Sequence, residues 1–387
     1  MEISERLKKL PTQFFSALVK KVNNAVAEGR DIINLGQGNP DQPTPPHIVK
    51  ALQTAAEDPK THKYSPFSGL SELKHAASEY YKKQYGVDID PEKEVAILFG
   101  TKTGLVELPM CLLNEGDLML LPDPGYPDYL SGVVLAGAQF KTFPLLAENR
   151  FLPDYNAIPL EDKEAAKLMY LNYPNNPTGA TADLKFFEET VTFAKKHRIS
   201  VVHDFAYGAI GFDGKKPTSL LEAEGAKDIG IEMYTLSKTY NMAGWRVGFA
   251  VGNQNIIESI NLIQDHLYCS LFPAIQLAAA AALTGDQSCV EELVSLYENR
   301  RNTFINAIRQ IGWNAQAPKG SFFAWLPVPK GFTSEEFADY LLEKADVAVA
   351  PGNGFGQYGE GYIRVGLLVD ESRLLEAVDR IRKLNLF

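Results

Sequence analysis

Short apolar runs alternate with longer amphipathic stretches through the middle of the chain, and this alternation limits the possible folds. Strands that alternate with helices typically form a mainly parallel sheet with helices on both faces. The last two runs lie close together in the sequence, so we expect them to pair antiparallel and make the sheet mixed. The six strand-like runs cover residues 96–99, 118–121, 168–172, 201–204, 233–236 and 247–251.

Residues suited to turns or to chemistry come just after these runs. In open α/β sheets, ligands gather beyond the carboxyl ends of the strands. We therefore expect one rim of the sheet to carry the chemistry of the protein. The residues that follow the runs are Gly100, Asp123, Asn176, Asp204 and Lys238.

The pattern changes after about residue 285. A long charged helix is expected over 291–308, followed by strand-like segments at 321–326 and 347–350 and a final amphipathic helix. We interpret this part as a smaller α+β domain, on which the first forty or so residues pack. The predicted division is a large domain at 46–285 and a small domain that combines 1–45 with 286–387.

Lys238 is the residue with the most informative surroundings. A lysine amine beside hydroxyl groups and an arginine suits an aldehyde cofactor that carries a phosphate. The amine would form an imine with the aldehyde, while Thr235, Ser237 and Arg246 would hold the phosphate. A lysine just after hydroxyl residues is a weak pattern when taken alone, because it more often means a surface lysine near an arginine.

Asp204 ends a buried run, and Tyr207 follows three residues later. A buried carboxylate is costly unless a cation pairs with it. A protonated pyridine nitrogen would be such a cation, and the pair would make the ring an electron sink; an Asp that caps the next helix is the alternative. Asn176 lies in the turn 172–179 and can donate to a phenolate oxygen, although Asn-Pro-x-Gly is also ordinary turn chemistry.

In their order and spacing, these motifs resemble those of class I (fold-type I) pyridoxal-phosphate-dependent aminotransferases. The resemblance runs from 35–40 to 362–366, nearly the whole chain. Within the family the chain is most similar to bacterial aminotransferases of methionine salvage, in segments 33–49, 172–180 and 203–209. The resemblance implies an α/β fold with a mixed, mainly parallel seven-stranded sheet sandwiched by helices, plus a smaller α+β domain.

The resemblance also implies a role for each matching residue around the cofactor ring. Lys238 forms the Schiff base with pyridoxal 5'-phosphate and, once freed by substrate, acts as the base that moves a proton. Asp204 pairs with the pyridinium nitrogen, and Tyr207 and Asn176 bond the ring hydroxyl oxygen. Tyr126 is expected to stack on the face of the ring.

The phosphate of the cofactor is expected at the start of a helix that follows Gly100. Backbone amides and the helix dipole at such a terminus favour an anion independently of any family. The resemblance implies that Tyr64 reaches the phosphate from the neighbouring subunit, which makes the active unit a homodimer. The other predicted members of the phosphate site are Thr101, Lys102, Thr103, Thr235, Ser237 and Arg246.

Arg364 is expected to bind the α-carboxylate of the substrate, together with Gly38 and Asn176. A planar guanidinium makes two parallel bonds to a carboxylate, which lysine cannot reproduce. An arginine in a surface ion pair at a strand end is the alternative. The resemblance further predicts that at least one of two bonds, Asp123–Pro124 and Asn176–Pro177, is cis.

The predicted reaction moves an amino group between an amino acid and a 2-oxo acid by a ping-pong mechanism. No arginine lies between Arg246 and Arg300 to pair with a second substrate carboxylate, and an unpaired carboxylate is costly. Phe14 and Phe15 would add apolar surface if the N-terminal arm folds over the cleft; otherwise they pack on the small domain. Both features favour an uncharged substrate: methionine and 4-methylthio-2-oxobutanoate, from the resemblance, or an aromatic amino acid. The alternatives are a β-lyase acting on cysteine S-conjugates and an aminotransferase for a dicarboxylate or diaminopimelate.

Composition argues against several other classes of protein. With 38 basic and 48 acidic side chains the net charge is -10, which disfavours nucleic acid and anionic membranes as partners. We find neither the apolar core of a signal peptide nor a stretch of roughly 20 apolar residues, so a cytoplasmic protein is expected. No DNA-binding domain fits before Gly36, and no G-x-G-x-x-G follows a strand, so a transcription regulator and a NAD enzyme are both disfavoured.

The cysteines and histidines show no metal-binding or redox spacing. The six histidines are scattered singly, and we expect no metal site. Each cysteine lies in an apolar or mixed helical context, so buried and inert thiols are expected at Cys111, Cys269 and Cys289.

Overall fold

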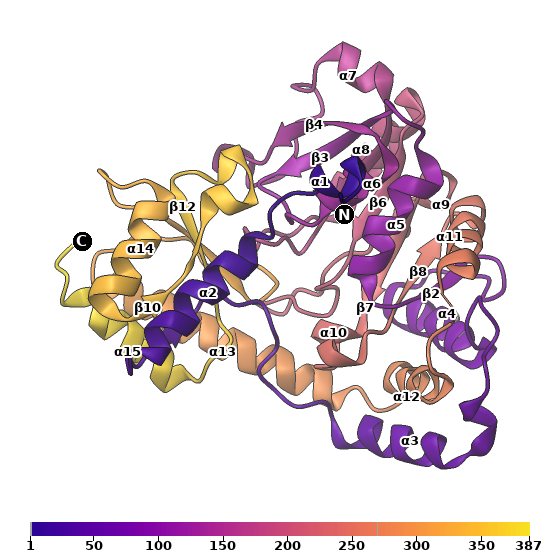
Figure 1. Cartoon of the computed structure of the whole chain (residues 1–387), viewed down its shortest axis with the longest axis horizontal. Helices are drawn as coiled ribbons and strands as arrows, with labels where there is room; N and C mark the ends of the chain where they lie inside the picture. Colours follow the sequence, from indigo (N-terminus) through magenta and orange to yellow (C-terminus); the bar gives the residue numbers. More distant parts are fainter. Residues whose placement is uncertain (1, 269) are drawn as a thin grey trace.

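The computed structural model describes residues 2–268 and 270–387, and a seven-stranded sheet lies at its centre (Figure 1). β8 pairs antiparallel with both of its neighbours, while the pairs from β7 to β4 along the sheet are parallel. The predicted mixed, mainly parallel sheet is therefore confirmed. In sheet order the strands are β2 (Val95–Leu98), β8 (Gly248–Gly252), β7 (Gly230–Thr235), β6 (Ser200–Asp204), β5 (Ala166–Leu171), β3 (Leu118–Asp123) and β4 (Gln139–Pro144).

Successive side chains of each strand point to opposite faces of the sheet, so both faces can be buried. In β5, Leu168 and Tyr170 pack in one hydrophobic cluster, and Met169 and Leu171 pack in another. Helices cover both faces, as predicted. One cluster contains α5 (Thr101–Leu112), α6 (Tyr129–Ala136) and α11 (Gln254–Leu267), and the other contains α3 (Pro46–Glu57), α4 (Ser71–Tyr85), α8 (Leu184–His197) and α12 (Pro273–Thr284).

The six apolar runs in the sequence all correspond to strands, and the expected antiparallel pair is β7 with β8, where Thr235 faces Gly248. The seventh strand, β4, has no such run. Its first four side chains are exposed and mostly polar, because it lies at the edge of the sheet. Only the family resemblance predicted it.

The C-terminal part has a separate hydrophobic cluster, in which Trp313, Leu326 and Val365 are buried. A three-stranded antiparallel sheet has the order β11-β12-β9. The expected charged helix, two strand-like segments and final helix are all present. Their bounds are α13 (Ser288–Gln310), β9 (Phe323–Pro327), α14 (Ser334–Ala345), β10 (Val347–Ala348), β11 (Ala350–Pro351), β12 (Tyr362–Gly366) and α15 (Glu371–Arg382).

The N-terminal arm packs against this C-terminal part, as expected from the sequence. β1 (Ile33–Asn34) pairs parallel with β10, and Val22 of α2 (Phe14–Ala27) packs with Leu342 and Ala348. Figure 1 shows α2 lying beside the C-terminal elements. The short elements are α1 (Glu5–Lys8), η1 (Pro59–His62), η2 (Ala147–Asn149), α7 (Leu160–Ala165), η3 (Leu220–Glu222), α9 (Ala226–Ile229), α10 (Leu236–Thr239), η4 (Ala243–Trp245), η5 (Gly352–Phe355) and η6 (Gln357–Gly359).

Both proline bonds named above, Asp123–Pro124 and Asn176–Pro177, are cis, which confirms that prediction, and Tyr173–Pro174 is cis as well. Cys111 and Cys289 are free and half-buried, less buried than expected, and burial raises the pKa of both thiols, that of Cys111 to about 11. Cys269 lies outside the described residues. Within the described ranges, none of the helices combines the length and the apolar character needed to span a bilayer.

Candidate active site

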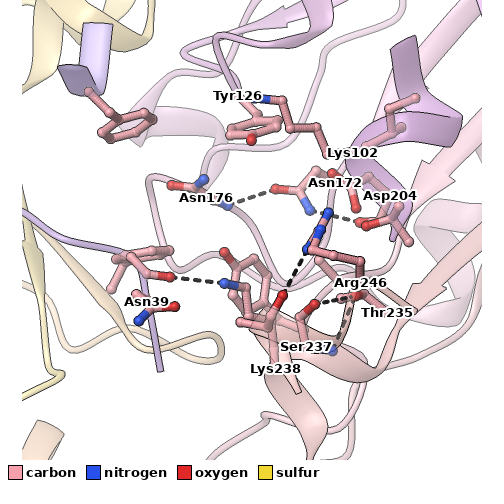
Figure 2. Close-up of a pocket in the computed structure, with 18 of the residues that line it drawn as sticks. Asn39, Lys102, Tyr126, Asn172, Asn176, Asp204, Thr235, Ser237, Lys238 and Arg246 are labelled. Atoms are coloured by element: carbon pink, nitrogen blue, oxygen red, sulfur yellow. Dashed lines mark hydrogen bonds between the residues drawn. The ribbon is translucent and has the colours of Figure 1, made fainter. Parts of the chain in front are cut away.

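A cavity of about 470 Å³ opens where β5, β6 and β7 end, at the predicted rim of the sheet. Figure 2 shows side chains from these three strand ends gathered around one space with Tyr126 and Lys102. The structure therefore brings most of the predicted site residues together. Those that line the cavity are Gly38, Thr101, Lys102, Tyr126, Asn176, Asp204, Tyr207, Thr235, Ser237, Lys238, Arg246 and Arg364.

Lys238 lies in α10, the single helical turn that follows β7. The Thr235 side chain caps this turn by accepting a hydrogen bond from the amide of Ser237 at 3.2 Å. The Lys238 amine donates to the main-chain carbonyl of Gly38 at 2.9 Å. Burial, reinforced by the charge of Arg364, lowers the pKa of Lys238 to about 8. The amine therefore loses its proton more readily than an ordinary lysine, which makes it a better nucleophile.

Asp204 ends β6 and is 6% exposed. Its Oδ2 atom accepts a hydrogen bond from the hydroxyl of Tyr129 at 2.8 Å, whereas Oδ1 is buried and has no protein partner. Burial raises the pKa of Asp204 to about 6. An unpartnered carboxylate oxygen in a cavity wall suits a cationic N–H group of a ligand, because such a group would offset the cost of burial.

Arg364 projects from β12 and is 1% exposed, so the alternative of a surface ion pair is wrong. Its Nη1 donates to Oδ1 of Asn176 at 2.8 Å, and its Nη2 donates to the carbonyl of Gly36 at 2.9 Å. The rings of Phe15 and Phe323 lie 5.1 and 4.1 Å from the guanidinium carbon. Burial lowers the pKa of Arg364 to about 10, so the side chain remains a cation at neutral pH.

The opposite end of the cavity has several hydrogen-bond donors. α5 begins at Thr101 after Gly100, whose φ of 78° suits glycine, and the first amides of a helix have no partner within the helix. A Cβ atom on Gly100 would collide with the guanidinium of Arg246. The hydroxyls of Thr235 and Ser237 are bonded to each other at 2.9 Å beside this corner. Amides, hydroxyls and a guanidinium together suit a phosphate.

Three residues predicted to hold the phosphate lie in different places relative to the cavity. Lys102 lines the cavity, but its amine pairs with Asp128 at 2.8 Å. Thr103 is not part of the cavity wall, because its hydroxyl donates to the carbonyl of Phe99 at 3.1 Å. Tyr64 is 84% exposed and does not line the cavity of its own chain. Its predicted role needs a second subunit and stays a prediction.

The sequence interpretation missed several residues of the cavity wall, including Asn172 and Phe323. It also missed Tyr129, which does not line the cavity but donates a hydrogen bond to Asp204. Tyr129 lies three residues after Tyr126, and Asn172 directly follows β5, so both could have been found by their position at the rim. Phe323 belongs to the C-terminal part, far away in sequence, and no local signal connects it to the cavity.

For the two phenylalanines at the start of α2, the sequence left open whether they cover the cleft or pack on the small domain. Phe15 lines the cavity beside Arg364. Phe14 instead packs edge-on against Phe355, with ring centroids 5.6 Å apart. Phe15 also packs edge-on against Phe355, with ring centroids 6.0 Å apart. Both rings therefore attach the arm to the C-terminal part, and Phe15 also adds apolar surface to the site.

The residues of this cavity fit pyridoxal phosphate, the cofactor expected from the sequence. The free Oδ1 atom of Asp204 suits the ring nitrogen, the ring of Tyr126 offers a stacking surface, and the amine of Lys238 suits the aldehyde. The donors at the start of α5 suit the phosphate. Among the described residues, no group of three or more His, Cys, Asp or Glu side chains is placed to hold a metal ion.

Comparison with known proteins agrees with this geometry. The family model of aminotransferase class I and II matches residues 30–381. The chain is 67% identical, over 100% of its length and 97% of the other protein, to the L-glutamine–4-(methylsulfanyl)-2-oxobutanoate aminotransferase of Bacillus subtilis (strain 168). It is 45% identical, over 99% of its length and 98% of the other protein, to the LL-diaminopimelate aminotransferase of Moorella thermoacetica. A substrate-bound structure of BacF from Bacillus subtilis superimposes with a TM-score of 0.96 at 50% identity, covering 100% of this chain and 98% of that one.

Proposed function

The chain belongs to the class I and II aminotransferases, which depend on pyridoxal phosphate, and we propose that methionine and 4-methylthio-2-oxobutanoate are its preferred substrate pair, with glutamine as amino donor. The observation that carries this proposal is the 67% identity, over the whole chain, to a relative named for that reaction. The predictions of an aminotransferase and of its cofactor are confirmed by the family match.

The wall of the cavity supports an uncharged substrate side chain. Among the described residues, Lys102 is paired with Asp128, so it is not free to bind a substrate carboxylate. Each remaining charged group of the wall has a proposed role with the cofactor or with the substrate α-carboxylate. A second carboxylate would therefore lack a cation and would be costly to bury. The remaining charged wall residues are Asp204, Lys238, Arg246 and Arg364.

We assign the chemical roles from the positions of these side chains. Bound pyridoxal phosphate supplies an aldehyde carbon and a ring that accepts electrons. Asp204 stabilises positive charge at the ring nitrogen through its free Oδ1 atom. The Lys238 amine, with its lowered pKa, takes a proton from the substrate α-carbon and would give it to the former aldehyde carbon of the cofactor. Arg364 holds the α-carboxylate so that this carbon faces Lys238.

The other predicted contacts are part of the same proposal. Tyr207 and Asn176 bond the ring hydroxyl oxygen, Tyr126 stacks on the ring, and Gly38 lines the carboxylate pocket. The phosphate is held by the donors at the start of α5 with Thr235, Ser237 and Arg246, and with the partner's Tyr64 as a further member. We also keep the division into a large domain at 46–285 and a small domain of 1–45 with 286–387.

A homodimer with Tyr64 acting across the interface can be tested by mixing two inactive variants. In a hybrid of Lys238→Ala and Tyr64→Ala subunits, action across the interface restores one complete site per dimer. Action within one subunit restores none. Activity that rises on mixing supports the proposal, and mixed protein as inactive as its parents contradicts it.

A cytoplasmic location is likewise proposed. The thiols of Cys111 and Cys289 are free, which suits a reducing compartment. Cell fractionation with an antibody to the protein tests the proposal, and recovery outside the cytoplasm contradicts it.

The substrate assignment is tested by stopped-flow half-reactions. The cofactor-loaded enzyme is mixed with methionine, glutamine, phenylalanine or LL-diaminopimelate, and the aminated form is then mixed with 4-methylthio-2-oxobutanoate. Methionine and glutamine are expected to convert the cofactor fully to its aminated form, with diaminopimelate far slower. A preference for diaminopimelate would move the assignment to that group of relatives. Release of pyruvate and ammonia from cystathionine without such conversion would indicate a β-lyase.

A further inference from the structure

A buried histidine and a buried glutamate are bonded directly behind the active site, and the mechanism above does not use them. His203 of β6 and Glu232 of β7 face each other across the two strands. Both side chains are fully buried, and Nδ1 of the histidine lies 2.7 Å from Oε2 of the glutamate. His203 immediately precedes Asp204, so the two side chains point to opposite faces of the sheet.

Glu232 receives a full set of hydrogen bonds. Its Oε1 atom accepts from the hydroxyls of Tyr81 and Ser219, and its Oε2 atom accepts from the amide of Leu220, each at 2.7 Å. A carboxyl group surrounded by donors on both oxygens is stabilised as the carboxylate, which only accepts. Nδ1 of His203 must therefore carry a hydrogen and donate it to Glu232.

The other ring nitrogen of His203 faces the main chain of Tyr173. Nε2 lies 2.9 Å from the Tyr173 carbonyl oxygen and 3.1 Å from its amide nitrogen. A neutral ring accepts a hydrogen bond from the amide at Nε2, and a protonated ring donates one to the carbonyl. In either state Glu232 fixes the orientation of the ring, and the ring stays bonded to Tyr173.

Tyr173 begins the turn that carries Asn176 into the cavity. The amide of Asn176 donates to Oδ1 of Asn172, and Nδ2 of Asn172 donates to the carbonyl of Asp204, both at 2.7 Å. Two consecutive residues of β6 thus hold the same turn from its two sides. We propose that His203 is a positioning residue that, oriented by Glu232, places Asn176 for its contact with the cofactor. This proposal rests on the proposed role of Asn176.

Two substitutions separate positioning from simple structural support. His203→Asn leaves a donor near the position of Nδ1, so Glu232 keeps its partner, but it removes the contact with Tyr173. His203→Gln places an amide near the position of Nε2, so it keeps the contact with Tyr173 and removes the donor to Glu232. Tyr81→Phe, which deletes another donor to the same carboxylate, is the matched control.

Three measurements are made on all variants. Hydrogen exchange of the segment 172–179 is followed without cofactor, and the thermal unfolding midpoint is recorded. The visible absorbance of the cofactor-loaded enzyme follows the protonation of the Schiff base at Lys238. The midpoint of its pH titration depends on hydrogen bonds to the ring oxygen, which Asn176 contacts. Loss of one hydrogen bond changes an equilibrium by roughly tenfold.

We expect His203→Asn to speed exchange in the turn about tenfold and to move the absorbance titration to higher pH. Its unfolding midpoint should fall as well, because the main chain of Tyr173 loses a buried partner. We expect His203→Gln and Tyr81→Phe to lower the midpoint with little change in the turn. Equal effects of both histidine variants on the exchange and on the titration, or native exchange in His203→Asn, would overturn the proposal. If His203→Asn does not fold, His203→Gln decides alone: native exchange in its turn supports the proposal, and faster exchange overturns it. A wild type that gains no visible band with pyridoxal phosphate would instead refute the proposed function, while the exchange result would still stand.

Discussion

Asp204 gives the sharpest test of the site, because its two carboxylate oxygens have different surroundings. Oδ2 is bonded to Tyr129, whereas Oδ1 is buried without a protein partner. Burial raises the pKa of Asp204 from 3.8 to about 6. At about 1.4 kcal/mol per pKa unit, this difference corresponds to about 3 kcal/mol between the protonated and ionised forms.

The raised pKa of Asp204 decides how the free energy of unfolding changes with pH. Between pH 3.8 and about pH 6 the folded protein holds a proton on Asp204 that the unfolded chain has lost. The stabilisation is therefore fully present below the unfolded pKa, and it is lost as the pH rises through the folded pKa. Asp204→Asn keeps the shape and an oxygen for Tyr129 but does not titrate. Without cofactor, the wild type is expected to lose about 3 kcal/mol relative to this variant between about pH 4 and about pH 8.

The assay is urea denaturation of both cofactor-free proteins at a series of pH values and at a fixed protein concentration. Other titrating groups are common to both proteins and cancel in the difference. A difference that stays within about 0.5 kcal/mol over the whole pH range would refute the description of Asp204. Saturating pyridoxal phosphate should reverse the order and stabilise the wild type more than Asp204→Asn, because the ring nitrogen then pairs with Oδ1.

The rate at which the cofactor-free enzyme binds pyridoxal phosphate covalently should rise with pH and level off above about pH 8, the pKa of Lys238. Stopped-flow absorbance measures this rate, and Lys238→Ala should show no covalent band. A rate that levels off only near pH 10 would contradict the lowered pKa. Arg364→Lys should raise KM for methionine about 10- to 100-fold with a smaller change in kcat, because a point charge replaces a donor that makes two parallel bonds. The surface substitution Arg382→Lys is the control. An unchanged KM in Arg364→Lys would mean that another residue binds the α-carboxylate. Tyr129→Phe removes a hydrogen-bond donor from Asp204, so the pKa of Asp204 should rise further and the dissociation constant of the cofactor should increase roughly tenfold. A fluorescence titration measures this constant. Native affinity would show that the hydrogen bond from Tyr129 does not contribute to cofactor binding.

The part of the molecule that could be predicted from the sequence is the part built from local patterns. Buried strands are apolar along their length, and the residues that follow them mark the rim, which is how Asp204 and Lys238 were found. β4 was not visible because an edge strand needs no apolar pattern. Tyr129 could have been found, because it lies three residues after Tyr126 at the same rim. Phe323 could not, because its contact with the site depends on how distant elements pack, and that packing leaves no trace in the neighbouring sequence.

The carbonyl of Gly38 contacts a cation of the cavity that lies far from it in the sequence. It accepts a hydrogen bond from the Lys238 amine, and the carbonyl of Gly36 does the same for Arg364. A buried cation with no acceptor would be costly, so each of these two backbone oxygens lowers the cost of burying its cation. The segment from Gly36 to Gly38 therefore contacts both cations, so a shift of this segment would change the surroundings of Lys238 and Arg364 together.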